Sequence, residues 1–122
     1  MKTTHVWKLP CRSQEFNEGP LLRPGPDRLA IAYDCETESG DYAWDEMTFT
    51  GLVAFTFTAA EHCTPEHVAA YDEVQEVLDS QWGTNLRGVD PNVHHYRMYF
   101  DDVGCYEVLA AAFVPPPPPK PV

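Results

Sequence analysis

The amino-acid sequence predicts an α+β fold, mainly antiparallel β-sheet with one or two short helices. Three features of the 122 residues carry this prediction. Apolar and polar side chains alternate with a period of two over residues 28–34 and 43–60, and a hairpin pattern follows at 93–114. One clear helix start, at Thr64, stands between them. With 43% hydrophobic and 12% aromatic residues, the chain has enough apolar side chains for one folded core.

Proline divides the chain into three parts. Residues 1–28 hold four prolines and two glycines, so we expect an irregular arm there. Residues 29–114 are expected to form a single α+β domain. Residues 115–122 begin with five consecutive prolines, which cannot donate ladder hydrogen bonds, so we expect an extended polyproline II tail.

The first two strands are predicted to form a hairpin around an acidic turn. Residues 28–34 place Leu29, Ile31 and Tyr33 on one side, and the turn CETESGDY follows. The longer strand, 43–60, alternates threonines with apolar residues, which are Met47, Phe49, Val53, Phe55 and Phe57. Gly51 stands where an apolar side chain is due, so we expect a bulge, a bend or a close backbone approach there.

The stretch from residue 63 to 92 begins with a helix signal. Thr64, Pro65 and Glu66 supply an N-cap hydroxyl, a first-turn proline and an acid near the helix N-terminus, which predicts a helix over about 65–70. Residues 71–79 combine helical spacing of apolar side chains with the β-branched content of a strand, and both interpretations stay open. Residues 82–92 have the Gly, Asn and Pro content of a loop.

The hairpin at 93–114 has two competing turn registers. A four-residue loop would set charged residues opposite apolar ones, whereas a three-residue loop at 102–104 separates one apolar face from one polar face. We therefore predict the three-residue loop, with Phe100 facing Tyr106 and Gly104 in the left-handed conformation. The outward polar face then carries Arg97, Tyr99 and Glu107.

The charge layout favours a basic partner, a cation, or an acidic surface that serves only solubility. The net charge is −11, and no Lys or Arg occurs from Leu29 to Leu86. Phosphate binding needs clustered Lys and Arg, so we expect no nucleic-acid partner. No apolar run approaches the ~18 residues of a membrane span. The residues that we expect to bind a partner are the carboxylates Asp34, Glu36, Glu38, Asp41, Asp45 and Glu46, together with the hairpin residues Arg97, Tyr99 and Glu107.

Motifs for catalysis or cofactor binding are lacking in the sequence. It has no GxSxG, no Ser/Lys pair, no nucleotide-binding glycine motif and no EF-hand order, so we expect neither an enzyme nor a cofactor. A composite zinc site is the alternative that the residue types permit, although no spacing matches a ligand motif. Its candidates are His62, Cys63, His67, His94, His95 and Cys105.

The cysteines and the N-terminus bear on the compartment. Cys11, Cys35, Cys63 and Cys105 are widely spaced, with no CxxC. The first residues lack the apolar core of a secretory signal, so we expect a cytoplasmic protein with free thiols.

Three segments carry a resemblance to known proteins. These are HHYRMYFDDVGCYEVLAAAF at 94–113, FTGLVAF at 49–55 and YDEVQEVLDSQW at 71–82. Together they resemble a group of small bacterial cytoplasmic proteins, some of which are immunity proteins of toxin systems. The resemblance covers about half of the chain and implies no catalytic residue.

These observations lead to one functional hypothesis and two alternatives. We expect a small acidic protein-binding module of the immunity or antitoxin type, which recognises a basic protein. The alternatives are a structural domain that forms a homodimer and a metal-binding protein that uses the His and Cys residues named above.

Overall fold

The computed structural model describes residues 2–117, in which seven strands form one antiparallel sheet with the order β1-β5-β6-β7-β4-β3-β2. The strands are β1 (Thr3–Lys8), β2 (Leu21–Pro24), β3 (Arg28–Glu36), β4 (Tyr42–Ala59), β5 (Glu73–Val77), β6 (His94–Phe100) and β7 (Gly104–Val114). Helix α1 (Pro65–Val68) is accompanied by 3-10 turns at Ser13–Glu15, Ala60–His62 and Trp82–Asn85. The predicted fold class is confirmed. Within residues 2–117 no helix is long and apolar enough to cross a membrane.

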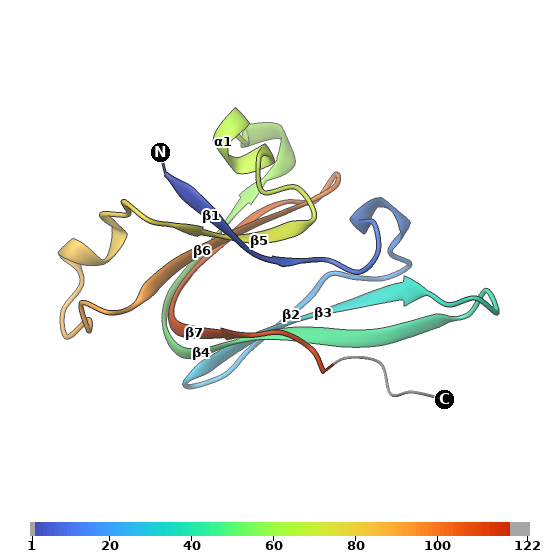
Figure 1. The fold of residues 1–122 in the computed structure, drawn as a ribbon, viewed down its shortest axis with the longest axis horizontal. Helices are drawn as coiled ribbons and strands as arrows, with labels where there is room; N and C mark the ends of the chain where they lie inside the picture. Colours follow the sequence, from blue (N-terminus) through green and yellow to red (C-terminus); the bar gives the residue numbers. More distant parts are fainter. Residues whose placement is uncertain (1, 118–122) are drawn as a thin grey trace.

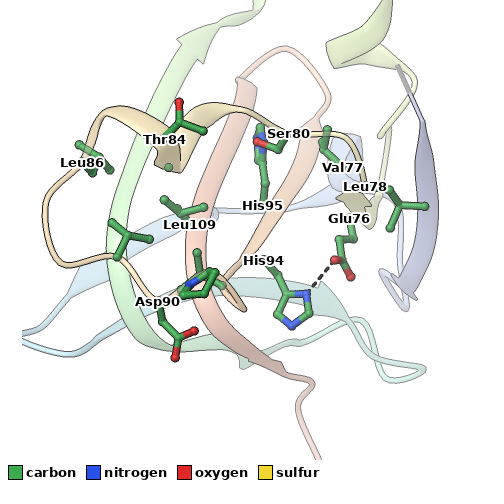
Figure 2. A pocket seen from close by; sticks show the side chains of 14 residues that line it. Glu76, Val77, Leu78, Ser80, Thr84, Leu86, Asp90, His94, His95 and Leu109 are labelled. Carbon is green, nitrogen blue, oxygen red and sulfur yellow. Dashed lines mark hydrogen bonds and ion pairs between the residues drawn. The ribbon is translucent and has the colours of Figure 1, made fainter.

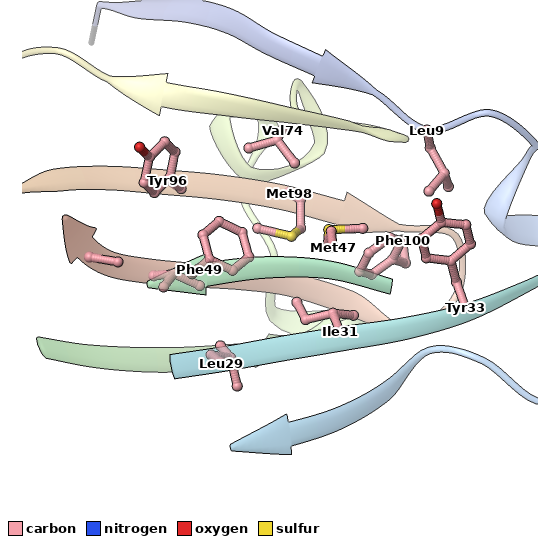
Figure 3. Packing of buried hydrophobic residues seen from close by; sticks show 12 residues of the cluster. Leu9, Leu29, Ile31, Tyr33, Met47, Phe49, Val74, Tyr96, Met98 and Phe100 are labelled. Atoms are coloured by element: carbon pink, nitrogen blue, oxygen red, sulfur yellow. The ribbon is translucent and has the colours of Figure 1, made fainter. Parts of the chain in front are cut away.

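The sheet curls so that its two halves face one another across the core. β1, β5 and β6 form one wall, β2 and β3 the other, and the long strands β4 and β7 bend between them (Figure 1). Side chains from both walls meet in the space enclosed by the curl (Figure 3). The buried cluster consists of Leu9, Leu29, Ile31, Tyr33, Met47, Phe49, Val74, Tyr96, Met98, Phe100, Val108 and Ala110. The predicted inward face of residues 28–34 is therefore confirmed.

Gly51 lies at the bend of β4, as predicted. Its φ of +62° falls in the left-handed region, and the pairing with β7 shifts register between Leu52 and Ala54. A Cβ at this position would lie 2.5 Å from the Cβ of Ala111, so only glycine fits without displacement of the neighbouring strand. The extra residue turns Val53 outward, where 38% of it is exposed, against the predicted alternation.

The hairpin of β6 and β7 forms with the predicted faces but not the predicted register. Phe100 pairs with Gly104 and Met98 with Tyr106, so the loop is residues 101–103 and the pairing differs by two positions. Asp102, with φ +59°, takes the left-handed position that was assigned to Gly104. Gly104 instead begins β7 and presses against β4, where an added Cβ would lie 2.1 Å from the carbonyl oxygen of Thr58. This contact with a strand distant in sequence sets the register.

The prediction of an irregular arm over residues 1–28 is wrong for two segments. β1 pairs with β5 and β2 pairs with β3, so both belong to the sheet and supply its two edges. Pro24 is the last residue of the edge strand β2. No hydrogen bond of the sheet is lost there, although proline has no backbone N–H to donate. The segment before residue 28 therefore contributes two strands to the sheet.

A disulfide joins Cys11 to Cys35 and ties the N-terminal segment to β3. The expectation of free thiols is wrong for this pair, although Cys63 and Cys105 are free. Such a bond is not typical of a reducing cytoplasm. The cytoplasmic location stays a prediction, and the disulfide does not favour it.

The segment after β4 confirms the predicted helix and decides the open alternative. The Thr64 hydroxyl accepts from the backbone N–H of His67 at 3.5 Å, and the His67 ring accepts from the Thr64 N–H at 3.0 Å, which closes a capping box. Residues 73–77 are strand β5, not helix. Residues 115–117 have no regular structure, and the rest of the predicted proline tail lies outside the described residues.

Candidate functional site

The tip of the β3–β4 hairpin carries the exposed part of the predicted partner surface. It projects beyond the rest of the sheet (Figure 1). Four of the predicted carboxylates are exposed there, namely Glu36, Glu38, Asp41 and Asp45. Tyr42 and Trp44 lie between them and are 42% and 44% exposed, although large aromatic side chains are usually buried. We call these six residues the acidic tip.

Two further carboxylates of the predicted surface have other partners. Asp34 is 1% exposed and accepts the backbone N–H groups of residues 17, 18 and 19 at 3.1, 2.8 and 2.9 Å. Asp34 therefore holds the N-terminal segment in place and cannot contact a partner. Glu46 lies 3.5 Å from Arg28 and 3.9 Å from Arg23, so its charge is paired on the surface.

The predicted outer face of the C-terminal hairpin is not a surface. Arg97 is 4% and Tyr99 9% exposed, because residues 60–72 cross over them. Ala70 packs against Tyr99 and Cys105, and its carbonyl accepts the backbone N–H of Tyr99 at 2.9 Å. The prediction that these hairpin residues bind a partner is therefore wrong, and no pattern in the sequence indicates the segment that covers them.

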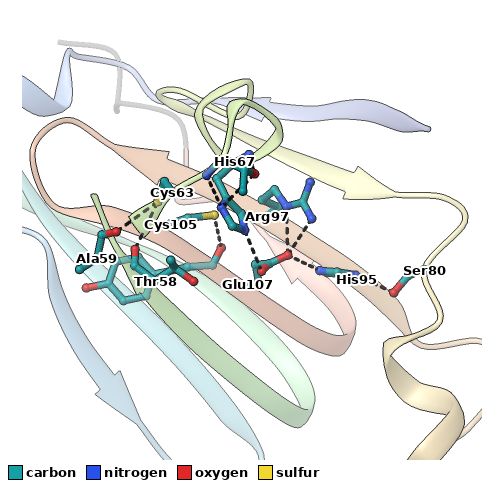
Figure 4. Close-up of polar contacts among 11 residues, drawn as sticks. Thr58, Ala59, Cys63, His67, Ser80, His95, Arg97, Cys105 and Glu107 are labelled. Carbon is teal, nitrogen blue, oxygen red and sulfur yellow. Dashed lines mark hydrogen bonds and ion pairs between the residues drawn. The ribbon is translucent and has the colours of Figure 1, made fainter. Parts of the chain in front are cut away.

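Beneath this segment Glu107 is the centre of a buried polar network (Figure 4). Its Oε1 accepts from Nε and Nη2 of Arg97 at 3.0 and 2.9 Å and lies 2.8 Å from Nε2 of His95. Its Oε2 lies 3.6 Å from Nε2 of His67, the histidine of the α1 capping box. Burial raises the pKa of Glu107, but the bonds from His95 and Arg97 and their charges outweigh burial and lower the pKa to about 2.

An ionised Glu107 fixes the direction of its own hydrogen bond with His95. A carboxylate only accepts, so His95 Nε2 carries a proton and donates it. In the neutral ring Nδ1 is then an acceptor, and it lies 2.6 Å from Oγ of Ser80. When the ring is neutral, Ser80 donates to His95, while the Ser80 oxygen accepts the backbone N–H of Trp82 at 3.2 Å. The edge of the Trp82 ring also packs on His95, at 5.0 Å between ring centroids.

Ser80 and His95 line a cavity of about 500 Å³ between the loop 78–93 and the β5–β6 strands (Figure 2). This volume is within the usual range of small-molecule sites. A second histidine–carboxylate pair lies at the wall, with His94 Nδ1 2.7 Å from Glu76. Leu78, Leu86 and Leu109 supply apolar lining.

The zinc alternative gains no support in the described part of the chain. No group of three or more His, Cys, Asp or Glu side chains among residues 2–117 is arranged to hold a metal ion. His62 is exposed beside Glu61, and the thiol of Cys63 faces the carbonyls of Thr58 and Ala59. Burial raises the pKa of the Cys105 thiol to about 12, which disfavours a thiolate ligand or nucleophile.

Ser80 is not among the residues that the sequence predicts to be functional. It stands in a polar stretch with no motif around it, and it meets His95 only because the loop 78–93 folds back onto β6. The alternation of the hairpin placed His95 and Glu107 on the same face as Arg97, which was the one available signal.

The fold and these sites define a small antiparallel β-sheet protein with a projecting acidic tip and a buried histidine–carboxylate network. The chain matches no protein-family model, no curated protein and no solved structure.

Proposed function

We propose that the protein is a small binding module that recognises a basic partner protein through its acidic tip. The observation that carries this proposal is the exposure of Tyr42 and Trp44 among four carboxylates on a projecting hairpin. Carboxylates attract Lys and Arg at long range, and aromatic faces bind the same cations at contact. An immunity protein that neutralises a basic toxin, the class implied by the resemblance, is a protein of this kind.

The charge of the tip supports a partner surface better than a structural role. The carboxylates of the tip have no Lys or Arg within ion-pair distance in the described residues, unlike Glu46 on the same strand. Burial of Tyr42 and Trp44 against a partner would remove apolar area from water and add to affinity. We expect nanomolar binding that weakens as salt is raised, with fast association at low salt.

The test compares two variants of equal net charge. The tip variant changes Glu36, Glu38, Asp41 and Asp45 to Gln or Asn, and the control changes the exposed Glu61, Glu66, Asp79 and Asp90 in the same way. Proteins from the source cells are captured on immobilised wild-type protein, and the basic protein recovered is purified and titrated against each variant. The tip variant should associate more than about tenfold more slowly at low salt, and Trp44→Ala should weaken the Kd about tenfold.

Two results would overturn the proposal. Equal losses in the tip variant and in the control would assign the binding to net charge alone. Unchanged binding by both the tip variant and Trp44→Ala would show that the acidic tip takes no part.

A further inference from the structure

We propose that Ser80 is a nucleophile, activated by His95, and that it accepts the acyl group of a small uncharged or cationic carboxylic ester in the neighbouring cavity. The inference concerns a different face of the molecule from the acidic tip and does not rest on the proposed function. Two observations carry it: the chain of hydrogen bonds from Ser80 through His95 to Glu107, and the cavity at its serine end.

The relay has the parts of a serine–histidine–acid triad. Ser80 Oγ lies 2.6 Å from His95 Nδ1, and His95 Nε2 lies 2.8 Å from Glu107 Oε1 (Figure 4). Such triads are recognised by geometry and roles, since they recur on unrelated folds with different residue orders. Here the serine faces Nδ1 and the acid faces Nε2, so Nδ1 is the nitrogen placed to take the serine proton.

The surroundings hold each member in its role. Glu107 is fixed by Arg97 and therefore keeps the His95 ring oriented with Nδ1 towards the serine. The Trp82 ring packs on His95, and the backbone N–H of Trp82 donates to one lone pair of Ser80 Oγ. The second lone pair of Oγ is left for attack on an electrophile.

The cavity suggests the substrate class. Its size of about 500 Å³ suits a small acyl group, and leucines from the loop and from β7 supply apolar contacts. Glu76 and Asp90 line it, and none of its lining residues is Lys or Arg (Figure 2). An anionic substrate would meet these carboxylates in a partly desolvated space, which favours uncharged or cationic esters.

The chemical step balances without a cofactor. Ser80 Oγ bonds to the ester carbonyl carbon while its proton passes to His95 Nδ1. The carbon–alkoxide bond then breaks, and His95 returns that proton to the departing alcohol. Water, with His95 again as base, attacks the acyl-serine and releases the carboxylic acid, which restores Ser80.

The experiment measures acylation of Ser80 directly. Full-length protein is incubated with p-nitrophenyl acetate or with an uncharged fluorophosphonate, and peptide mapping by mass spectrometry locates the adduct. We expect one adduct, on Ser80, absent in Ser80→Ala and formed about 100-fold more slowly in His95→Asn. Ser39→Ala, which removes an exposed serine of the β3–β4 turn, should label at the wild-type rate.

Several outcomes would overturn the proposal. If the folded wild-type protein forms no adduct on Ser80, the serine only anchors the loop 78–93. This outcome is read from the wild-type protein alone and does not depend on whether a variant folds. Labelling spread over several serines, or equal rates for wild type and His95→Asn, would show that His95 does not activate Ser80. Faster reaction with an anionic ester than with a neutral one would refute the substrate class.

Discussion

The largely buried Glu107 predicts that one carboxylate makes the stability of the fold sensitive to acid. Its side chain is 15% exposed, and its pKa in the folded protein is lowered to about 2 from an ordinary value of 4.5. The ionised form therefore stabilises the fold fully above pH 4.5, and this stabilisation is lost as the pH falls towards 2. A gap of about 2.5 pH units, at about 1.4 kcal/mol per unit, corresponds to about 3.5 kcal/mol.

Urea unfolding of wild type and Glu107→Gln between pH 7 and pH 3 measures this contribution. From pH 5 to pH 3 the wild-type free energy of unfolding should fall by about 2 kcal/mol more than that of the variant. At neutral pH the variant should itself be less stable by about 3 kcal/mol or more, because the substitution removes the carboxylate charge that Arg97 binds. Glu38→Gln, on the exposed turn, should change neutral-pH stability by less than about 0.5 kcal/mol.

Parallel pH curves for wild type and Glu107→Gln would refute the reasoning. If the variant does not fold, a carbon NMR titration of the wild-type carboxyl groups gives the same answer. The Glu107 resonance should have its midpoint below pH 3, and a midpoint near 4.5 would show that Arg97 and His95 do not hold the charged form.

Three further predictions concern the fold. Gly104→Ala should destabilise by about 3 kcal/mol or more in thermal unfolding, because its Cβ would lie 2.1 Å from the carbonyl oxygen of Thr58 at a φ of +141°. Joint replacement of Cys11 and Cys35 by serine should cost about 3 kcal/mol, since the bond spans 24 positions; mass spectrometry of the unreduced, alkylated protein should show the linked peptides. Asp34→Ala should cost about 3 kcal/mol and expose residues 17–19 to amide hydrogen exchange, because three backbone N–H groups lose their acceptor.

Matched controls separate these effects from general damage. Gly40→Ala also places a Cβ at positive φ, +89°, but meets nothing within 4 Å and should cost about 1 kcal/mol. Cys63→Ser keeps a donor for the two carbonyls that the thiol faces, and Asp41→Ala removes an exposed carboxylate. A loss in any of these three controls as large as in its partner experiment would contradict the assigned cause.

The strands were predictable wherever one face of the sheet is buried. Alternation in residues 28–34 and 94–100 reports which side chains face the core, and this information is local in the sequence. The bend at Gly51 was predictable for the same reason, since a glycine interrupts an otherwise regular pattern. Thr64 fixed the helix start, because capping also depends on neighbouring residues alone.

The hairpin register shows where local reasoning ends. A shift by two positions keeps every side chain on its face, so sorting of faces cannot distinguish the two pairings. The deciding contact is between Gly104 and Thr58, which are far apart in sequence. Strands β1 and β2 were missed similarly, because turn formers dominate the segments around them and their pairing partners supply the order.

Burial also changes the meaning of the acidic run from Leu29 to Leu86. Composition alone makes its carboxylates equivalent, yet Asp34 and Asp72 are buried acceptors of hydrogen bonds from the N-terminal segment. Glu76 and Glu73 lie beside histidines on the wall of β5. Unfolding and binding measurements should therefore separate two groups of carboxylates in this run. Removal of the buried or paired carboxylates should lower the free energy of unfolding. Removal of the carboxylates at the acidic tip should lower the association rate with a partner and have little effect on stability. If the tip carboxylates changed stability and left association untouched, the charge of this chain would serve its fold and not a partner.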